Sequence, residues 1–286
     1  MNDFAPSENR LPPLLEVQHL SVSVARGAGW QPLVRDVGFR LDGGLSALVG
    51  ESGSGKSMTA RALLGLTSPG CRIDAATLSL RGQELRTASP AQWARLRGCH
   101  LGLVQQDPRY ALNPVRSVSW QVEEGLRLHQ RGLGRAERRE RVAAILSAVG
   151  LDPVRRLLDA YPHELSGGMG QRVMLAASLI CEPELLIADE PTSVLDASLR
   201  DQILDLIARL AAERRMTVLV ISHDLPLVAR YCGQVLVMRN GELLETLPAD
   251  RLAEATHPYT RMLWRCQPSA ATYGQMLPVM DEGEWQ

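Results

Sequence analysis

The sequence predicts an α/β fold in which a mostly parallel, buried sheet carries an antiparallel β edge and a helical subdomain insert. Three observations predict it. An apolar run at 45–49 leads into a glycine-rich loop and then into strong helix formers at 57–66. Several further short runs are too apolar to have a face in water, which is typical of strands in a parallel sheet. Residues 114–160 instead carry apolar side chains at helical spacing.

The expected elements follow from these patterns. Segments 14–24 and 33–41 alternate apolar and polar residues, so we expect two strands of an antiparallel edge. Val118, Val122 and Leu126 share one helical face in the insert, and a later helix is expected at 197–214. Further strands are expected at 73–80, 101–105, 185–188, 218–221 and 235–238.

These elements divide the chain into four parts. Residues 12–108 form a first core segment, and residues 109–165 form the helical subdomain. Residues 166–246 complete the core. After Gly241 the chain runs into a tail, residues 247–286, which offers little periodic signal from Gln267 onward.

Composition excludes several classes. The chain has 286 residues, of which 45% are hydrophobic and 22% charged, as in an ordinary soluble globular protein. A formal net charge of -1 supplies no field for nucleic acid, so no nucleic-acid partner is expected. No apolar run approaches the roughly 18 residues of a membrane span, so we expect a cytosolic protein that meets a membrane through a protein partner. The five cysteines are scattered, which argues against a structural metal or disulfide framework.

The chain's single lysine lies in its most informative motif. Lys56 is the exception among 31 basic residues. It belongs to the G-x-x-x-x-G-K-S pattern of a phosphate-binding loop. An ammonium is a compact point charge that fits between the oxygens of adjacent phosphates, whereas a guanidinium is planar and forked. The motif reads Gly50-Glu51-Ser52-Gly53-Ser54-Gly55-Lys56-Ser57.

A second motif is the apolar run 185–188, which ends in two carboxylates. Beside a phosphate loop, Asp189 can hold Mg²⁺ together with Ser57. Glu190 can then orient or deprotonate an attacking water. The alternative is an ordinary strand that ends in solvated acids, and the phosphate loop makes that alternative weak.

The third motif contains Ser166, Gly167 and Gly168. Ser166 can cap the helix that follows, and the two glycines expose backbone N–H groups at its positive end. This is a second phosphate-binding surface. One nucleotide does not need two such surfaces, so we expect the second to serve a nucleotide held by a partner subunit. A helix cap with incidental glycines is the alternative.

In this order the motifs resemble those of the ATP-binding subunits of ABC transporters, over residues 14–261. The resemblance implies a P-loop NTPase fold of ABC type. It makes 50–57 the Walker A loop, 165–172 the signature and 185–190 the Walker B strand. Gln106 is then the Q-loop glutamine, Asp196 belongs to the D-loop and His223 is the switch histidine.

The resemblance also implies cofactors and roles. ATP and Mg²⁺ are expected, with catalysis by Lys56, Gln106, Glu190 and His223. The metal ligands would be Ser57, Gln106 and Asp189. ATP would be bound by residues 50–57, by Ser166, Gly167, Gly168 and Asp196 of the partner-facing surface, and by Trp30, to which we assign adenine stacking because Val22 and Val24 are aliphatic.

Partners follow from the same resemblance. A second ATPase subunit, commonly a different one in this branch, would close head to tail over two ATP molecules. Two transmembrane permease subunits would dock near residues 106–116, and a substrate-binding protein would act through them. The chain would then be peripheral, on the cytoplasmic face of the cell membrane.

Two segments indicate the branch. Residues 107–114 and the sequence His257-Pro258-Tyr259-Thr260-Arg261 resemble the importers of peptides and nickel. The signature and short tail are similar to nickel-importer subunits, so nickel or a metal-chelator complex is the preferred cargo and a di- or oligopeptide the alternative. Only Cys266 follows the second segment, and no iron-sulfur cluster is predicted.

Two departures from the family pattern have structural consequences. Gly170 replaces a longer side chain and is expected to soften its helix, because glycine costs about 0.5–1 kcal/mol there relative to alanine. Val194 stands where a smaller residue is common. Rival classes fit less well: a DNA-maintenance ATPase would need a long coiled coil, and a non-hydrolysing module would lack Glu190 or His223.

Overall fold

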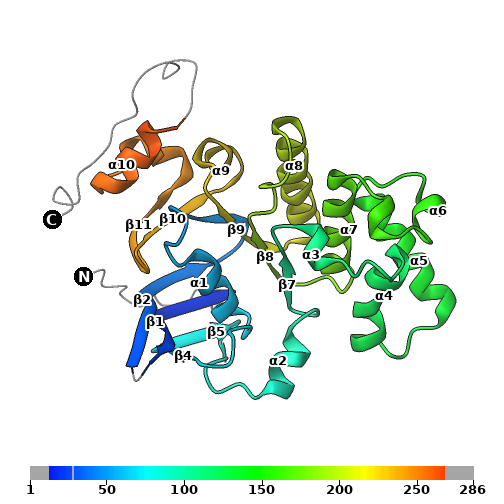
Figure 1. Ribbon diagram of the computed structural model, residues 1–286, viewed down its shortest axis with the longest axis horizontal. Coiled ribbons are helices and arrows are strands. Elements are labelled where there is room, and N and C mark those ends of the chain that lie inside the picture. The colour runs from blue at the N-terminus through cyan, green and yellow to red at the C-terminus, as the bar shows by residue number, and fades with distance from the viewer. Residues whose placement is uncertain (1–12, 28, 268–286) are drawn as a thin grey trace.

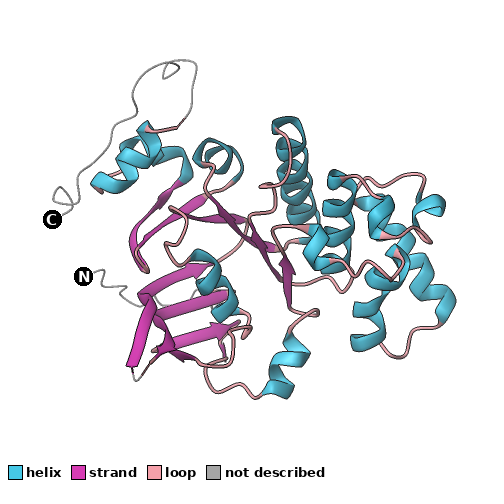
Figure 2. Ribbon diagram, viewed as in Figure 1, coloured by secondary structure: helices cyan, strands magenta, loops and turns pink. Residues whose placement is uncertain are grey.

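The computed structural model describes residues 13–27 and 29–267, which form two sheets and a set of helices on one side (Figures 1 and 2). An antiparallel sheet contains the N-terminal strands, and a larger sheet runs through the middle of the molecule. Figure 1 shows a helical region beyond the β7 edge of the larger sheet. This arrangement confirms the expected α/β class with an antiparallel edge and a helical insert.

The antiparallel sheet is built around β1 (Leu15–Arg26), which pairs with β2 (Gly29–Leu41). The strand expected at 73–80 is two strands, β4 (Cys71–Asp74) and β5 (Thr77–Leu80). The reason lies in β1, whose register shifts around His19, at φ 54°. β4 and β5 therefore pair with different stretches of β1, and β6 (Gln83–Glu84) extends the sheet beside β5.

The larger sheet has the order β11-β10-β3-β9-β8-β7. All of its neighbouring pairs are parallel except β10 with β11. The expected strands at 45–49, 101–105, 185–188, 218–221 and 235–238 are all confirmed here. The strands are β3 (Leu45–Val49), β7 (Leu101–Val104), β8 (Leu185–Asp189), β9 (Thr217–Ser222), β10 (Gln234–Arg239) and β11 (Glu242–Pro248).

Both faces of this sheet are covered. Along β3, Ala47 and Val49 belong to one core cluster, and Leu48 belongs to the other. The first cluster joins the sheet to α7 (Gly167–Leu179) and α8 (Ala197–Arg214), and the second joins it to α1 (Lys56–Leu63) and the antiparallel sheet. The remaining helices of the core are α2 (Pro90–Leu96) and α9 (Leu225–Tyr231). The helix expected at 197–214 is confirmed. The helix expected at 57–66 is also present as α1, but it ends at Leu63, before Gly65 at φ 61°.

The helical insert contains α3 (Pro108–Ala111), α4 (Val118–His129), α5 (Arg135–Ala148), α6 (Val154–Leu157) and the short 3₁₀ helix η1 (Pro162–Glu164). Val118, Val122 and Leu126 are fully buried, as their spacing predicts. The insert packs against α7, which belongs to the same core cluster. In the described part of the chain, no helix is both long and apolar enough to cross a membrane.

The C-terminal part is more structured than a tail. β11 pairs with β10 and is followed by η2 (Ala249–Glu254) and α10 (Pro258–Arg265). Tyr259 and Thr260 of α10 are fully buried. Residues 268–286 of the expected tail lie outside the described residues.

Candidate functional site

The phosphate loop joins β3 to α1. Gly50 and Gly55 have φ angles of 150° and 104°. A Cβ at Gly50 would collide with the Met238 carbonyl oxygen, and one at Gly55 would lie 3.0 Å from the Leu33 carbonyl oxygen. These two positions therefore require glycine, and the loop is wedged against β2 and β10.

Lys56 folds back into this loop. Its Nζ donates hydrogen bonds to the carbonyl oxygens of Gly50 and Glu51, each at 2.8 Å. Burial lowers the pKa of the ammonium, and the nearby carboxylates of Glu190, Asp189 and Glu51 act in the opposite direction. A buried cation thus bonds to two backbone carbonyl groups of the loop.

Ser57 and Asp189 meet beside the lysine. The Ser57 hydroxyl donates to Oδ1 of Asp189, the last residue of β8, at 3.1 Å. Burial raises the pKa of Asp189, although the Ser57 bond opposes the shift. A hydroxyl and a carboxylate are oxygen donors of the kind Mg²⁺ prefers, so this pair fits the expected metal. Gln106 lines a pocket of about 500 Å³ together with Asp189.

Glu190 lies between two polar side chains. The Gln106 Nε2 donates to its Oε2 at 3.1 Å, and His223 Nδ1 lies 3.6 Å from its Oε1. The three residues follow β7, β8 and β9, which are neighbours in the sheet. Since the carboxyl ends of parallel strands meet at one edge of a sheet, the three side chains lie close together. Glu190 itself has φ 47°, in the left-handed region that non-glycine residues rarely adopt. The predicted catalytic residues are thus brought together.

Two further contacts hold this edge. The Ser193 hydroxyl donates to the Glu190 carbonyl oxygen at 3.1 Å. Arg200 Nε donates to the Leu195 carbonyl oxygen at 3.0 Å, and Arg200 Nη1 lies 3.6 Å from Asp224 Oδ2. Arg200 therefore links the loop after Glu190 to the loop that carries His223. Sequence analysis missed it, because nothing local distinguishes it from the other arginines.

The segment predicted to be the signature lies elsewhere on the molecule. Ser166 caps α7, since its hydroxyl accepts a hydrogen bond from the Met169 N–H at 3.4 Å. Gly167 is exposed, and Asp196, also exposed, caps α8. Figure 1 shows α7 apart from α1. Among residues 13–27 and 29–267, no hydrogen bond or ion pair joins 166–168 to the phosphate loop.

The structure also shows the surroundings of Trp30 and of Gly170 and Val194, the two residues that depart from the family pattern. Trp30 is 54% exposed in β2, opposite Ala25, and it is Leu33 of the same strand that touches the loop. Adenine stacking by Trp30 stays a prediction. A Cβ at Gly170 would lie 3.3 Å from Pro108, so this glycine lets α3 pack on α7. Val194 is 42% exposed, beside the Gln106 pocket.

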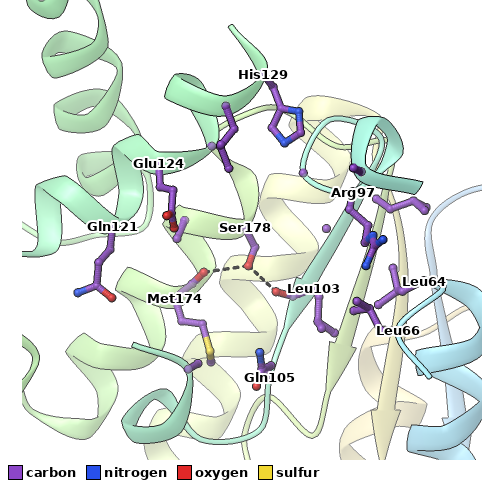
Figure 3. Close-up of a pocket in the computed structure, with 18 of the residues that line it drawn as sticks. Leu64, Leu66, Arg97, Leu103, Gln105, Gln121, Glu124, His129, Met174 and Ser178 are labelled. Atoms are coloured by element: carbon purple, nitrogen blue, oxygen red, sulfur yellow. Dashed lines mark hydrogen bonds between the residues drawn. The ribbon is translucent and has the colours of Figure 1, made fainter. Parts of the chain in front are cut away.

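A larger pocket of about 760 Å³ lies between the core and the helical insert (Figure 3). Its walls come from α2, β7, α4 and α7. On one side the Ser178 hydroxyl donates to the carbonyl oxygens of Leu103, at 2.6 Å, and Met174, at 3.0 Å. Neither the phosphate loop nor Glu190 lines it, so this pocket is distinct from the phosphate site.

A glycine-rich phosphate loop, a buried lysine and a carboxylate pair at the carboxyl edge of a parallel sheet define a P-loop nucleotide-binding protein. Residues 34–193 match the family model described as ABC transporter. The chain belongs to the ABC transporter family.

Relatives support this over most of the chain. A Brucella abortus (strain 2308) protein, provisionally named a peptide import ATP-binding protein, is 42% identical over 94% of this chain and 81% of its own. The dipeptide transport ATP-binding protein DppD of Escherichia coli (strain K12) is 40% identical over 90% of this chain and 79% of its own. The glutathione import protein GsiA of Pectobacterium atrosepticum is 41% identical over 93% of this chain but 44% of its own. These names back the peptide alternative better than the preferred nickel assignment.

Solved structures confirm the ABC-type P-loop fold. The structure of cbiO1 from Clostridium perfringens, described as part of the ABC transporter complex cbiONQ, has a TM-score of 0.73 and 26% identity, over 85% of this chain and 91% of that one. A dimeric bacterial ABC transporter cassette has a TM-score of 0.73 and 25% identity, over 82% and 98%.

Proposed function

We propose that this chain is the Mg²⁺-dependent, ATP-hydrolysing motor subunit of a bacterial importer whose cargo is a di- or oligopeptide. The observation that carries the ATPase part is Glu190, held by Gln106 at 3.1 Å and flanked by His223 at 3.6 Å, beside the Ser57–Asp189 pair. The names of the relatives, which include dipeptide and glutathione import, support the peptide part.

In this mechanism the residues divide the work. The loop N–H groups and Lys56 bind the β- and γ-phosphates of ATP. Mg²⁺ would be held by Ser57, Asp189 and Gln106, and when bound it neutralises charge on the phosphate oxygens. Glu190 orients the attacking water and accepts its proton. The Gln106 amide holds that carboxylate in place, and His223 faces it from the next strand.

The signature surface supports a paired assembly. Ser166 and Gly167 lie on an exposed helix start, far from their own chain's phosphate loop. Backbone N–H groups at a helix start bind phosphate well. They would therefore complete the nucleotide site of a second ATPase subunit, in a head-to-tail pair. The dimeric cassette among the solved neighbours is consistent with such a pair.

Contact with two transmembrane permease subunits is proposed for the groove between core and insert (Figure 3). Leu128, which lines it, is 58% exposed, and Tyr110 and Val115 of the segment 106–116 are 88% and 74% exposed. Apolar side chains in such a position fit a docking surface. Docked there, the chain would lie on the cytoplasmic face of the cell membrane as a peripheral subunit, with a substrate-binding protein acting through the permeases.

The test is ATP hydrolysis by the transporter reconstituted with its binding protein. Peptide-loaded binding protein should stimulate wild-type turnover, and Glu190→Gln should lower kcat by about 10²–10⁴-fold, because a general base is lost. The matched control is Glu140→Gln, at an exposed position on α5, and it should leave kcat unchanged.

Unchanged turnover in the Glu190→Gln transporter would contradict the ATPase assignment of that residue. The cargo is tested separately by loading the binding protein with Ni²⁺ or with a metal-chelator complex. Stimulation by these species alone would restore the nickel alternative and leave the motor assignment intact.

A further inference from the structure

Tyr259 is the largest of the fully buried side chains in the described residues, although it lies far along the chain from every phosphate-site motif. It belongs to the segment 257–261, which resembles the importers of peptides and nickel. Its hydroxyl accepts a hydrogen bond from the Glu51 N–H at 3.1 Å. Glu51 is the second residue of the phosphate loop, so α10 reaches the nucleotide site.

The Glu51 residue is held from two directions. The Tyr259 hydroxyl accepts a hydrogen bond from the Glu51 N–H, and Lys56 Nζ donates one to the Glu51 carbonyl oxygen at 2.8 Å. The Ser54 N–H also donates to that carbonyl, at 3.2 Å. When a triphosphate draws the ammonium toward its oxygens, the Lys56 bonds to the backbone weaken. The bond from α10 does not depend on the ammonium.

Several contacts fix the position of Tyr259 and of the start of α10. Glu245 of β11 accepts hydrogen bonds at 2.8 Å from both the N–H and the hydroxyl of Thr256, directly before α10. The His257 ring accepts from the Tyr259 N–H at 3.1 Å and so caps the helix. The Arg239 guanidinium lies 5.0 Å from the centre of the Tyr259 ring. The hydroxyl stays protonated, because burial raises its pKa to about 12.

The same C-terminal part of the chain supports the loop at a second point. The Gly241 N–H, in the turn between β10 and β11, donates to the Ser54 carbonyl oxygen at 3.0 Å. A Cβ at Gly241 would lie 2.6 Å from the Leu33 carbonyl oxygen, so the turn is pressed against β2. The outer side of the loop therefore rests on residues 241 and 259.

We propose that Tyr259 is a positioning residue of the phosphate loop: its hydroxyl fixes the Glu51 peptide so that the loop is already shaped for a triphosphate. This proposal rests on the proposed ATP-binding function. It assigns α10 a role in nucleotide affinity, since a pre-shaped site loses less conformational freedom when ligand binds.

The test is Tyr259→Phe, which keeps the ring and removes the hydroxyl. The affinity of the purified chain for ATP should weaken by about two- to tenfold, the range of one hydrogen bond. In the assembled transporter, KM for ATP should rise by a similar factor while kcat stays within about twofold. The matched control is Tyr231→Phe, because the Tyr231 hydroxyl donates to the Asp201 carbonyl oxygen at 3.3 Å, between α9 and α8.

Tyr231→Phe should leave ATP affinity unchanged. If Tyr259→Phe lowered the unfolding temperature but left affinity and KM at the wild-type values, the hydroxyl would be structural only and the proposal would be overturned. A fall in kcat at unchanged KM would overturn it too. Failure of the wild-type chain to bind ATP would instead contradict the proposed function. If Tyr259→Phe does not fold, Thr256→Val, which removes one bond to Glu245, should weaken affinity in the same direction.

Discussion

At the scale of single residues, the candidate site contains two ionisable side chains, Lys56 and Asp189, whose pKa values are shifted by burial. Lys56 is 5% exposed, and burial lowers its pKa. Burial raises the pKa of Asp189, its neighbour across the loop. Both shifts favour the neutral form, so each charge opposes folding to some degree and is retained for binding. The carboxylate is the simpler of the two to test, because asparagine keeps its shape.

Asp189→Asn should raise the unfolding temperature of the nucleotide-free protein at pH 7.5 by a few degrees. The sign follows from the raised pKa: the ionised carboxylate destabilises the fold above the folded-state pKa, and this penalty disappears as pH falls to the ordinary carboxyl value. The difference between variant and wild type should therefore shrink at lower pH, as measured by calorimetry.

The control for this prediction is Asp159→Asn, at an exposed position. It should shift the unfolding temperature by little at any pH. Mg²⁺-ATP should stabilise the wild type more than Asp189→Asn, because the variant loses a proposed metal ligand. A lower unfolding temperature for Asp189→Asn without nucleotide would refute the argument.

At the scale of elements, α7 shows that the role of a glycine in a helix depends on packing as well as on helix propensity. Gly170 predicts a softened helix, yet α7 runs unbroken over Gly167–Leu179. The glycine instead permits close packing, because α3 approaches to within 3.3 Å of the position of a Cβ. α3 directly follows Gln106 and Asp107, so this packing positions the segment from which Gln106 bonds to Glu190.

Gly170→Leu should destabilise the protein by about 1–3 kcal/mol, the usual effect of overpacking, and lower ATP turnover through displaced Gln106. Unfolding temperature and kcat measure the two effects. Gly132→Leu is the control, since nothing lies within 4 Å of a Cβ there. Equal effects of the two substitutions would mean that contact with Pro108 is unimportant.

Sequence predicts an element well when its signal is local. β3, β8 and α8 each carry a complete apolar pattern and appear within one residue of their expected ends. The split between β4 and β5 depends on the register of β1, so it has no local signal. α10 does begin with local signals, the His257 cap and Pro258, but the bonds from Thr256 to Glu245 that fix it on β11 are not visible in the local sequence. The same holds in the site, where the motifs predict Lys56 and Glu190 but not Arg200.

At the scale of the whole molecule, the phosphate loop and the proposed second phosphate-binding surface at 166–168 would not serve one nucleotide in one chain. The phosphate loop lies at the start of α1 and the signature at the start of α7, apart from each other in Figure 1. Association is therefore part of the proposed catalytic cycle, and closure over ATP would move the helical inserts, at which the membrane subunits are proposed to dock.

Glu190→Gln protein should associate when Mg²⁺-ATP is added, either with itself or with the second ATPase subunit, as measured by sedimentation. Adding Gly167→Asp should abolish association without affecting ATP binding to the single chain, because Gly167 is exposed and a Cβ there meets nothing within 4 Å. If Gly167→Asp weakened ATP binding to the isolated chain, the signature would act within its own subunit.

The single lysine has one more consequence. Because Lys56 is the only side-chain amine in the sequence and is 5% exposed, acylating reagents have a single internal target, located where triphosphate would bind. Amine chemistry on this protein therefore reports occupancy of the loop, and lysine-directed cross-linkers cannot map its surface. Maps of its contacts must use carboxylates or thiols.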